Sequence, residues 1–295
     1  MSAHIGAAFD LADDTAYQAW RADKLARYPK SLAELVVEVR DPCALSRGER
    51  QALLECCSRA NMAVYASPVG GDADKEIPRR LGLQLGLRDL DPNFLADDDG
   101  ISPLAVAQRG TRGEFIPYTN RGIKWHTDGY YNTAERTVRA VLLHCVERAE
   151  TGGENELLNH EIAYIQLRDR DPQHIRALMA DDALTIPARI EDGRIERPAQ
   201  SGPVFSVDTS GFLHMRYTAR AVSIEWKSDA TTQAALVALE DILVGESPCR
   251  FRGRLEPGMG LVCNNILHTR TPFIDSPVHK RLIYRARYYQ RVNAG

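Results

Sequence analysis

The feature that most constrains the fold of this chain is the seven-residue stretch Trp125-His126-Thr127-Asp128-Gly129-Tyr130-Tyr131. Successive side chains of a β-strand point to opposite faces, so residues two apart share a face. If the stretch is a strand, His126 and Asp128 point at the same place. An imidazole and a carboxylate are two of the three protein ligands in the facial triad of a metal site. The stretch therefore predicts a strand that carries most of a metal centre.

The doublet of His126 and Asp128 leaves two interpretations open. One is an ordinary strand with a polar face, since polar residues are mostly exposed. The other is the site of a non-haem Fe(II) oxygenase. Such a site needs a second histidine from a distant strand, because adjacent residues cannot surround a metal. Among the eight histidines of the chain, His268 stands out, since it follows a predicted strand and a turn at Asn264-Asn265.

The composition is that of a globular protein in solution. The 295 residues fit one large domain or two small ones, and 44% of them are hydrophobic and 26% charged. A net charge of −3 offers no attractive field to nucleic acid or to an anionic membrane, so we expect neither as a partner. No apolar run could span a bilayer, and the N-terminus lacks the pattern of a signal peptide. We therefore expect a cytoplasmic protein whose six cysteines are reduced.

Hydrophobic periodicity predicts short strands interrupted by helices. Helices are expected over residues 14–28, 46–60, 78–85, 159–168, from 171, and 229–244. Strands are expected over residues 62–66, 123–128, 137–146, 156–158, 204–207, 212–217, 249–255, 260–264 and 281–290. The regular alternation of a parallel α/β sheet is missing. The pattern predicts a β-rich α+β fold, in which helices surround a core of strands.

The last predicted strand carries three arginines at a spacing of two. Arg281, Arg285 and Arg287 share one face with Ile283 and Tyr289. Such a face is either a solvated surface or the wall of an anion-binding cavity. Arginine suits carboxylates because its planar guanidinium group binds both oxygens.

The order of these motifs resembles the Fe(II)- and 2-oxoglutarate-dependent dioxygenases, most closely the taurine dioxygenase and γ-butyrobetaine hydroxylase group. The motifs are His126-x-Asp128, Gly152-Gly153-Glu154-Asn155, His268 and Lys280-Arg281-x-x-x-Arg285. The likeness covers roughly residues 115–290. It implies a double-stranded β-helix, or jelly-roll, core flanked by helices and long active-site loops.

The resemblance also implies an organisation of the whole chain. We expect a single dioxygenase domain over residues 1–295, with the jelly-roll core at 115–290. A helical N-terminal segment at 1–65 would pack on this core, and a helical insertion would occupy about 159–245. The segments 68–120 and 189–203 are rich in Gly, Pro or Asp. They are expected either to cover the site as lids or to be plain surface loops.

By this likeness His126, Asp128 and His268 would bind Fe(II). The distal carboxylate of 2-oxoglutarate would be held by Arg281, with Asn155 at a position where taurine dioxygenase has threonine. The enzyme would then use O2 to hydroxylate an unactivated C–H bond of a small molecule, releasing succinate and CO2. Desaturation, ring closure and C–C cleavage use the same iron centre and stay open.

The substrate is the least determined part of this prediction. The candidate substrate-binding residues are Tyr118, Asn120, Arg121, Tyr130, Tyr131 and Arg285. The two adjacent tyrosines could stack on a cation, or could simply pack the wall of the site. Arginines instead favour an anionic group, so a small polar metabolite such as an amino acid, a betaine or a sulfonate is expected. Arg285 has a second interpretation, as a charge partner of the metal-binding residues.

Two other functions use the same residues. Zinc on the three ligands would make a hydrolase or lyase, although no motif supplies the general base that a hydrolase needs. A non-catalytic protein that binds 2-oxoglutarate or metal is the third hypothesis. Whether the chain forms a homo-oligomer is left open by the sequence.

Overall fold

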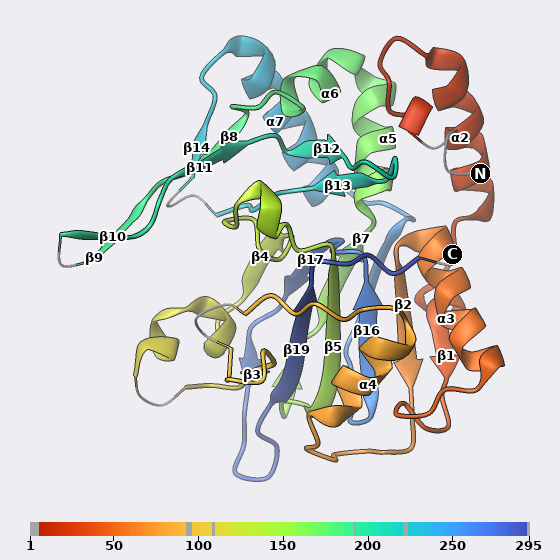
Figure 1. Ribbon diagram of the computed structural model, residues 1–295, viewed down its shortest axis with the longest axis vertical. Helices are drawn as coiled ribbons and strands as arrows, with labels where there is room; N and C mark the ends of the chain where they lie inside the picture. Colours follow the sequence, from red (N-terminus) through yellow and green to blue (C-terminus); the bar gives the residue numbers. More distant parts are fainter. Residues whose placement is uncertain (1–5, 93–95, 108–109, 192, 221–223, 294–295) are drawn as a thin grey trace.

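The computed structural model describes residues 6–92, 96–107, 110–191, 193–220 and 224–293. It contains two larger sheets with helices around them (Figure 1). The six-stranded main sheet has the order β1 (Val36–Glu38), β2 (Met62–Ala66), β16 (Met259–Cys263), β5 (Ala140–Glu147), β19 (Leu282–Tyr288), β3 (Ser102–Leu104). Its pairs are antiparallel apart from β1 with β2. The expected mixed fold of helices and many strands is confirmed.

The second sheet is smaller and holds the motif that opened the sequence analysis. Its antiparallel order is β15 (Arg250–Gly253), β7 (Asn155–Leu158), β17 (Leu267–Arg270), β4 (Ile123–His126). Strand β4 ends at His126, so Asp128 lies just beyond the strand that was expected to include it. His126 is thus the last residue of β4, and it lies beside β17.

The helices begin and end where local residues satisfy their backbone groups. They are α2 (Asp14–Arg27), α3 (Arg47–Ala60), α4 (Glu76–Gln84), α5 (His160–Arg170), α6 (Pro172–Leu178) and α7 (Ala230–Val244). Ser46 and Glu49 form the predicted capping box of α3, and Asn61 ends this helix in the left-handed conformation. Asn159 and Asp229 cap α5 and α7 with their side chains.

Short elements complete the description. The 3₁₀ helices are η1 (Leu32–Leu35), η2 (Thr111–Glu114), η3 (Ile116–Tyr118) and η4 (Ala134–Arg136). The small sheets pair β6 (Thr151–Gly152) with β18 (Phe273–Ile274), β12 (Phe205–Val207) with β13 (Leu213–Met215), and β9 (Arg189–Glu191) with β10 (Arg194–Arg197), and join β11 (Gln200–Gly202), β8 (Leu184–Ile186) and β14 (Glu225–Trp226). The β9–β10 hairpin projects from the body of the protein (Figure 1).

Three segments differ from what the sequence predicts. The first 65 residues contribute β1 and β2 to the main sheet besides their helices. The segment 68–120, expected to be mostly loop apart from a helix at 78–85, contains α4 close to that range and also the edge strand β3. The insertion at about 159–245 contains β8–β14 as well as three helices. Strands β2, β12 and β13 match strands that the sequence predicts, whereas the others have two to four residues and are too short to show a period of two.

The main sheet is covered by helices that pack against its strands. Strand β5 is buried on both faces along almost its whole length, as its continuous apolar sequence predicts. Helix α4 packs on β5 and β19, and α3 packs on β1 and β2. All six cysteines are free thiols. None of the described helices is long and apolar enough to cross a bilayer.

Candidate metal centre

The structure brings the three predicted metal ligands together at the junction of β4 and β17. His126 and His268 are paired directly across these two strands, and their ring centroids lie 4.2 Å apart. Asp128 Oδ1 lies 3.8 Å from His126 Nε2. Each of the three side chains has one ligand atom that lies within 4.8 Å of those of the other two. The described residues contain no other such group of three His, Cys, Asp or Glu side chains.

Both imidazoles are oriented by their own strands. The Nδ1 atom of His126 lies 2.9 Å from the carbonyl oxygen of Lys124, and that of His268 lies 3.0 Å from the carbonyl of Ile266. A carbonyl only accepts, so each Nδ1 carries a proton, and in a neutral imidazole the lone pair is then on Nε2. Fixing the tautomer in this way is the usual role of the residues behind a metal-bound histidine.

The charge state of the site suits a metal. Burial, and then the neighbouring His268, lower the pKa of His126 to about 3, so its imidazole is neutral at pH 7. Burial alone would raise the pKa of Asp128, but nearby cationic groups, Arg285 first, hold it below its ordinary value. Asp128 Oδ2 is buried and has no hydrogen-bond partner in the described part of the chain. Two imidazoles, that of His126 neutral, and an ionised, partly unpaired carboxylate fit a divalent cation.

Asn265 holds the backbone of Asp128 and was not predicted as a site residue. Its side-chain oxygen accepts a hydrogen bond from the Asp128 N–H at 2.7 Å, and its Nδ2 donates to the Asp128 carbonyl at 2.9 Å. The same Nδ2 also donates to the carbonyl of Val138 at 2.7 Å. Asn265 has a positive φ of 49°, which Asn tolerates better than most residues. The Asn-Asn pair signalled a turn, but nothing in the sequence shows what a turn residue touches.

The predicted co-substrate residues line one small cavity together. Arg281 and Asn155 face it together with the turn at Gly152 and Gly153. Arg281 is 7% exposed, and its guanidinium donates only a 3.5 Å hydrogen bond to the carbonyl of Leu104. It forms no salt bridge with any carboxylate that the structure describes. Burial lowers the pKa of Arg281 to about 10. A buried cation without a counterion favours an anionic ligand.

Two other arginines line this cavity, but they already have a counterion. Arg148 Nε and Arg254 Nη2 lie 3.1 and 3.0 Å from the Glu256 carboxylate. Asn155 donates to the carbonyl of Thr269 at 2.6 Å, which leaves its second amide hydrogen available. Arg281 is therefore the arginine of this cavity whose charge is open to a ligand.

The Gly-Gly turn allows the chain to pass close to β18. Gly152 and Gly153 both have positive φ, at 76° and 78°. A Cβ atom at Gly152 would overlap the Pro272 carbonyl oxygen, and a Cβ at Gly153 would lie 3.6 Å from Arg281 Nε. The turn thus needs glycine for its conformation and for its closeness to Pro272.

Arg285 touches the metal-binding residues themselves. Its Nη1 lies 3.3 Å from Asp128 Oδ1. Of the two interpretations of this arginine, the structure shows the charge partner. Arg287, on the same face of β19, pairs with the buried carboxylate of Asp91 and donates to Tyr131 Oη at 2.8 Å. The arginine face predicted from the spacing is thus the wall of the site, not a solvated surface.

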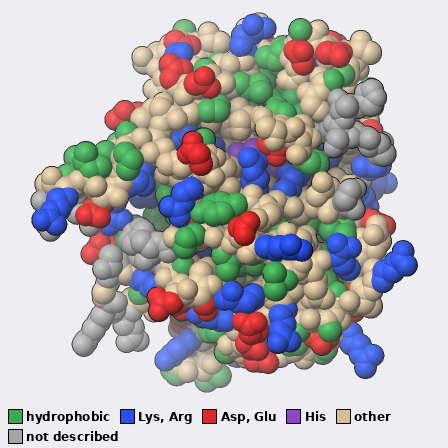
Figure 2. All heavy atoms as spheres, viewed as in Figure 1, with side chains coloured by type: hydrophobic (Ala, Val, Ile, Leu, Met, Phe, Trp, Pro, Cys, Tyr) green, Lys and Arg blue, Asp and Glu red, His purple; other side chains and the backbone are tan. Residues whose placement is uncertain are grey.

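The two tyrosines after the motif lie among arginines. Their rings are in edge contact with centroids 5.2 Å apart. Tyr130 Oη accepts from Arg220 at 3.3 Å, and the guanidinium of Arg197 lies 6.0 Å from the Tyr131 ring. Figure 2 shows histidine side chains near the middle of one face, with Lys or Arg side chains beside them. The surroundings of the tyrosines are therefore positively charged.

The other candidate substrate residues precede the motif. Asn120 and Arg121 are exposed, whereas Tyr118 is buried beneath the guanidinium of Arg112. Arg270 holds this segment by donating to the carbonyls of Pro117, Thr119 and Arg121 at 3.2, 2.7 and 2.6 Å. The structure therefore shows how the segment is anchored, and the substrate role of its side chains stays a prediction.

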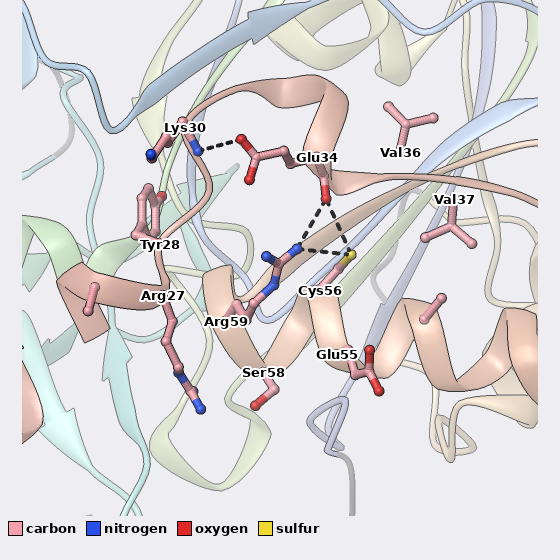
Figure 3. A pocket seen from close by; sticks show the side chains of 12 residues that line it. Arg27, Tyr28, Lys30, Glu34, Val36, Val37, Glu55, Cys56, Ser58 and Arg59 are labelled. Carbon is pink, nitrogen blue, oxygen red and sulfur yellow. Dashed lines mark hydrogen bonds between the residues drawn. The ribbon is translucent and has the colours of Figure 1, made fainter. Parts of the chain in front are cut away.

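A larger cavity lies elsewhere and has a different character. It measures about 780 Å³ and lies between the end of α2, η1, β1 and α3. Figure 3 shows Arg59 there, donating to the Glu34 carbonyl at 3.2 Å beside the Cys56 thiol. The cavity lining does not include the triad. Its size therefore does not make it the reactive site.

Comparison with known proteins agrees with this geometry. The curated relatives include a uridine-5'-phosphate dioxygenase of Amycolatopsis sp, 32% identical over 181 residues, which are 60% of this chain and 64% of that enzyme. A uridine-5'-phosphate dioxygenase of Streptomyces sp is 31% identical over 204 residues, or 66% of this chain and 72% of that enzyme. A solved asparagine oxygenase in complex with Fe(II), 3-hydroxyasparagine and succinate has a similar fold, with a TM-score of 0.55 and 17% identity over 82% of this chain and 84% of that one.

A family model matches most of the chain. The model of the taurine catabolism dioxygenase TauD, TfdA family matches residues 30–287. This range includes the triad, the Gly-Gly turn and the arginines of β19, which are the residues that carried the resemblance. The chain therefore belongs to the TauD/TfdA dioxygenase family, as the order of its motifs predicts.

Proposed function

We propose that the protein is an Fe(II)- and 2-oxoglutarate-dependent oxygenase in which His126, Asp128 and His268 hold the iron. The observation that carries this proposal is the convergence of one ligand atom from each of these three side chains within 4.8 Å of one another. With 2-oxoglutarate and O2, the iron would supply the oxidising power for insertion of oxygen into a C–H bond, with release of succinate and CO2. The chain's own residues would bind, orient and exclude water.

We further propose that the two larger sheets form a double-stranded β-helix core within a single domain of residues 1–295. His126 and His268 lie on the paired strands β4 and β17 of one sheet, and Arg285 lies on β19 of the other. Asp128 and Arg281 lie within two residues of the ends of β4 and β19. Strands position side chains more rigidly than loops do. A location in the cytoplasm and a homo-oligomeric state remain predictions of the sequence.

The role we propose for Arg281 is to bind the distal carboxylate of 2-oxoglutarate. Its guanidinium is buried in the cavity, makes one weak hydrogen bond and has no paired carboxylate in the described chain. Burial, and then the nearby positive charges of Arg281 and Arg285, lower the pKa of Arg270. A dicarboxylate would neutralise this excess of positive charge. Asn155, on the same wall, would donate its remaining amide hydrogen to the same ligand.

The substrate we propose carries an anionic group, and a nucleoside 5'-phosphate is the first candidate. The cation-binding role considered for Tyr130 and Tyr131 is disfavoured, because arginines already lie against both. A betaine head group would be repelled there. The two curated relatives are named uridine-5'-phosphate dioxygenases, and a phosphate ester suits an arginine-lined site.

The proposal is tested by succinate formation. Protein with Fe(II), 2-oxoglutarate and O2 is incubated with uridine 5'-phosphate, uridine or taurine, and succinate and residual substrate are measured. We expect uridine 5'-phosphate to stimulate succinate formation most, and His268→Ala to abolish it. Turnover of the phosphate ester without O2 in zinc-loaded protein would instead establish a hydrolase. Iron binding without succinate formation would establish a non-catalytic protein.

A further inference from the structure

We propose that Arg197 and Arg189, at the base of the β9–β10 hairpin, form the subsite for the anionic group of the substrate. This inference rests on the proposed function and names the residues that would give the enzyme its preference for an anion. The hairpin lies within a segment that the sequence marked only as a candidate lid.

The pairing of the hairpin places these two guanidinium groups together. Arg189 and Arg197 are directly opposite each other on β9 and β10, so both side chains leave the same face. Like charges opposite each other destabilise a two-stranded sheet. The ladder is also irregular between Ile195 and Arg197. The ladder thus brings two cationic side chains to one face at the base of the hairpin.

Both side chains lie against aromatic rings of the body of the protein. The guanidinium of Arg189 is 4.9 Å from the centroid of the Phe115 ring, and that of Arg197 is 6.0 Å from the Tyr131 ring. Tyr131 is three residues beyond Asp128 and accepts a hydrogen bond from Arg287 on β19. The base of the hairpin is therefore connected through Tyr131 to the segment that carries Asp128, whereas the tip projects away from the body (Figure 1).

Arg197 keeps donor capacity that the described chain does not use. Its Nη2 donates to the Pro187 carbonyl at 2.8 Å, but its Nη1 is buried without a hydrogen-bond partner among the described residues. No described carboxylate pairs with it. A buried, unsatisfied donor on a charged group is costly unless a ligand completes it.

Arg216 adds a second positive charge, which pairs with no carboxylate among the described residues. Its guanidinium donates to four backbone carbonyls, those of Tyr130, Leu184, Gln200 and Gly202. Burial, followed by repulsion from Arg197, lowers the pKa of Arg216 to about 10. Its hydrogen bonds make it a scaffold that ties Tyr130 to β8 and β11. Its charge still adds to the field that an anion at Arg197 would neutralise.

A phosphate monoester is the ligand that best fits these groups. The planar N–H donors of a guanidinium group match the oxygens of a phosphate, and Arg197 Nη1 is such a donor at this site. Figure 2 shows Lys or Arg side chains where the projecting hairpin meets the body. The subsite is separate from Arg281, which lies in the cavity lined by the Gly-Gly turn.

The test compares binding of uridine 5'-phosphate and uridine, which differ only in the phosphate. Equilibrium dialysis is performed without O2 on the protein loaded with Mn(II) and 2-oxoglutarate. The variants are Arg197→Gln and Arg189→Gln, with Arg194→Gln as the matched control. Arg194 is on β10 of the same hairpin, is exposed, and pairs across the ladder with Glu191. Circular dichroism confirms that each variant is folded.

We expect the wild type to bind uridine 5'-phosphate about 10- to 100-fold more tightly than uridine, the effect of losing a charged hydrogen bond. Arg197→Gln and Arg189→Gln should each remove most of this preference, and Arg194→Gln should keep it. Equal or undetectable binding of the two ligands to the wild type, survival of the preference in both variants, or its equal loss in Arg194→Gln overturns the proposal. The proposed function fails separately, by absence of the Fe(II)–2-oxoglutarate absorption band in the wild type.

Discussion

The side chain of Asn265 forms two hydrogen bonds with the backbone of Asp128. It accepts from the N–H at 2.7 Å and donates to the carbonyl at 2.9 Å. The two residues come from segments 137 positions apart in the chain. Asp128 lies just past the end of β4, where a strand ladder no longer holds it. The buried amide of Asn265 takes over this function and sets the position of the carboxylate relative to His126.

Replacing Asn265 by Ala should therefore weaken metal binding. We expect about a 10- to 100-fold loss of affinity for Mn(II) or Fe(II), the usual effect of removing a group that orients a ligand. The matched control is Asn264→Ala. Asn264 is equally buried but holds Val292, accepting from its N–H at 2.9 Å and donating to its carbonyl at 3.2 Å. Titration calorimetry of the folded variants separates the two, and equal affinities in both would contradict the proposed role.

Arg281→Gln should weaken 2-oxoglutarate binding and leave metal affinity within about twofold. The expected loss is about 2 kcal/mol, the range for a hydrogen bond to a charged group. Arg148→Gln is the control, because Arg148 lines the same cavity but is paired with Glu256 at 3.1 Å. Anaerobic titration with 2-oxoglutarate measures the affinity of both variants for this co-substrate. An undiminished affinity of Arg281→Gln for 2-oxoglutarate would show that Arg281 does not bind the distal carboxylate.

Gly152→Ala should destabilise the protein far more than Gly193→Ala. Both glycines have a φ of 76°, so both changes carry about 1 kcal/mol of backbone strain. A Cβ at Gly193 meets open space, whereas a Cβ at Gly152 overlaps the carbonyl oxygen of Pro272. We expect the free energy of unfolding in urea to fall by several kcal/mol for Gly152→Ala. Equal losses would show that the turn is not as close to β18 as described.

His160 should make the protein sensitive to acid. Burial lowers the pKa of His160 to about 4. Its Nε2 donates to the Leu213 carbonyl at 3.0 Å, which leaves a buried, unprotonated Nδ1 without a described partner. The unfolded chain takes up this proton near pH 6.5 and the folded chain only near pH 4, so stability is full above pH 6.5 and is lost as the pH falls between these values.

The variant His160→Gln keeps a donor for Leu213 and removes the titration. Between pH 6 and 4.5, the slope of the unfolding free energy against pH should decrease by up to about 1.4 kcal/mol per pH unit, the contribution of one proton. Urea unfolding at several pH values measures the slope. An unchanged slope would mean that His160 is protonated in the folded state.

The sequence predicts the ligands of the site better than their supports. His126 and Asp128 follow from the period of a strand, and the arginine face of β19 follows from the same period. The sequence does not predict Asn265 and Arg270 as site residues, because their function depends on contacts with segments more than 100 residues away. No local pattern reports such contacts. Similarly, Arg189 and Arg197 lie on strands of three and four residues, which are too short for periodicity to detect.

The most direct test of the central claim is anaerobic addition of Fe(II) and then 2-oxoglutarate to the metal-free protein. We expect a weak visible charge-transfer band in the wild type, because three protein ligands, His126, Asp128 and His268, would leave iron able to bind the co-substrate as well. The band should be absent from His126→Ala and His268→Ala and should require higher 2-oxoglutarate concentrations in Arg281→Gln. A wild-type protein that binds iron but shows neither this band nor succinate on exposure to O2 would contradict the account.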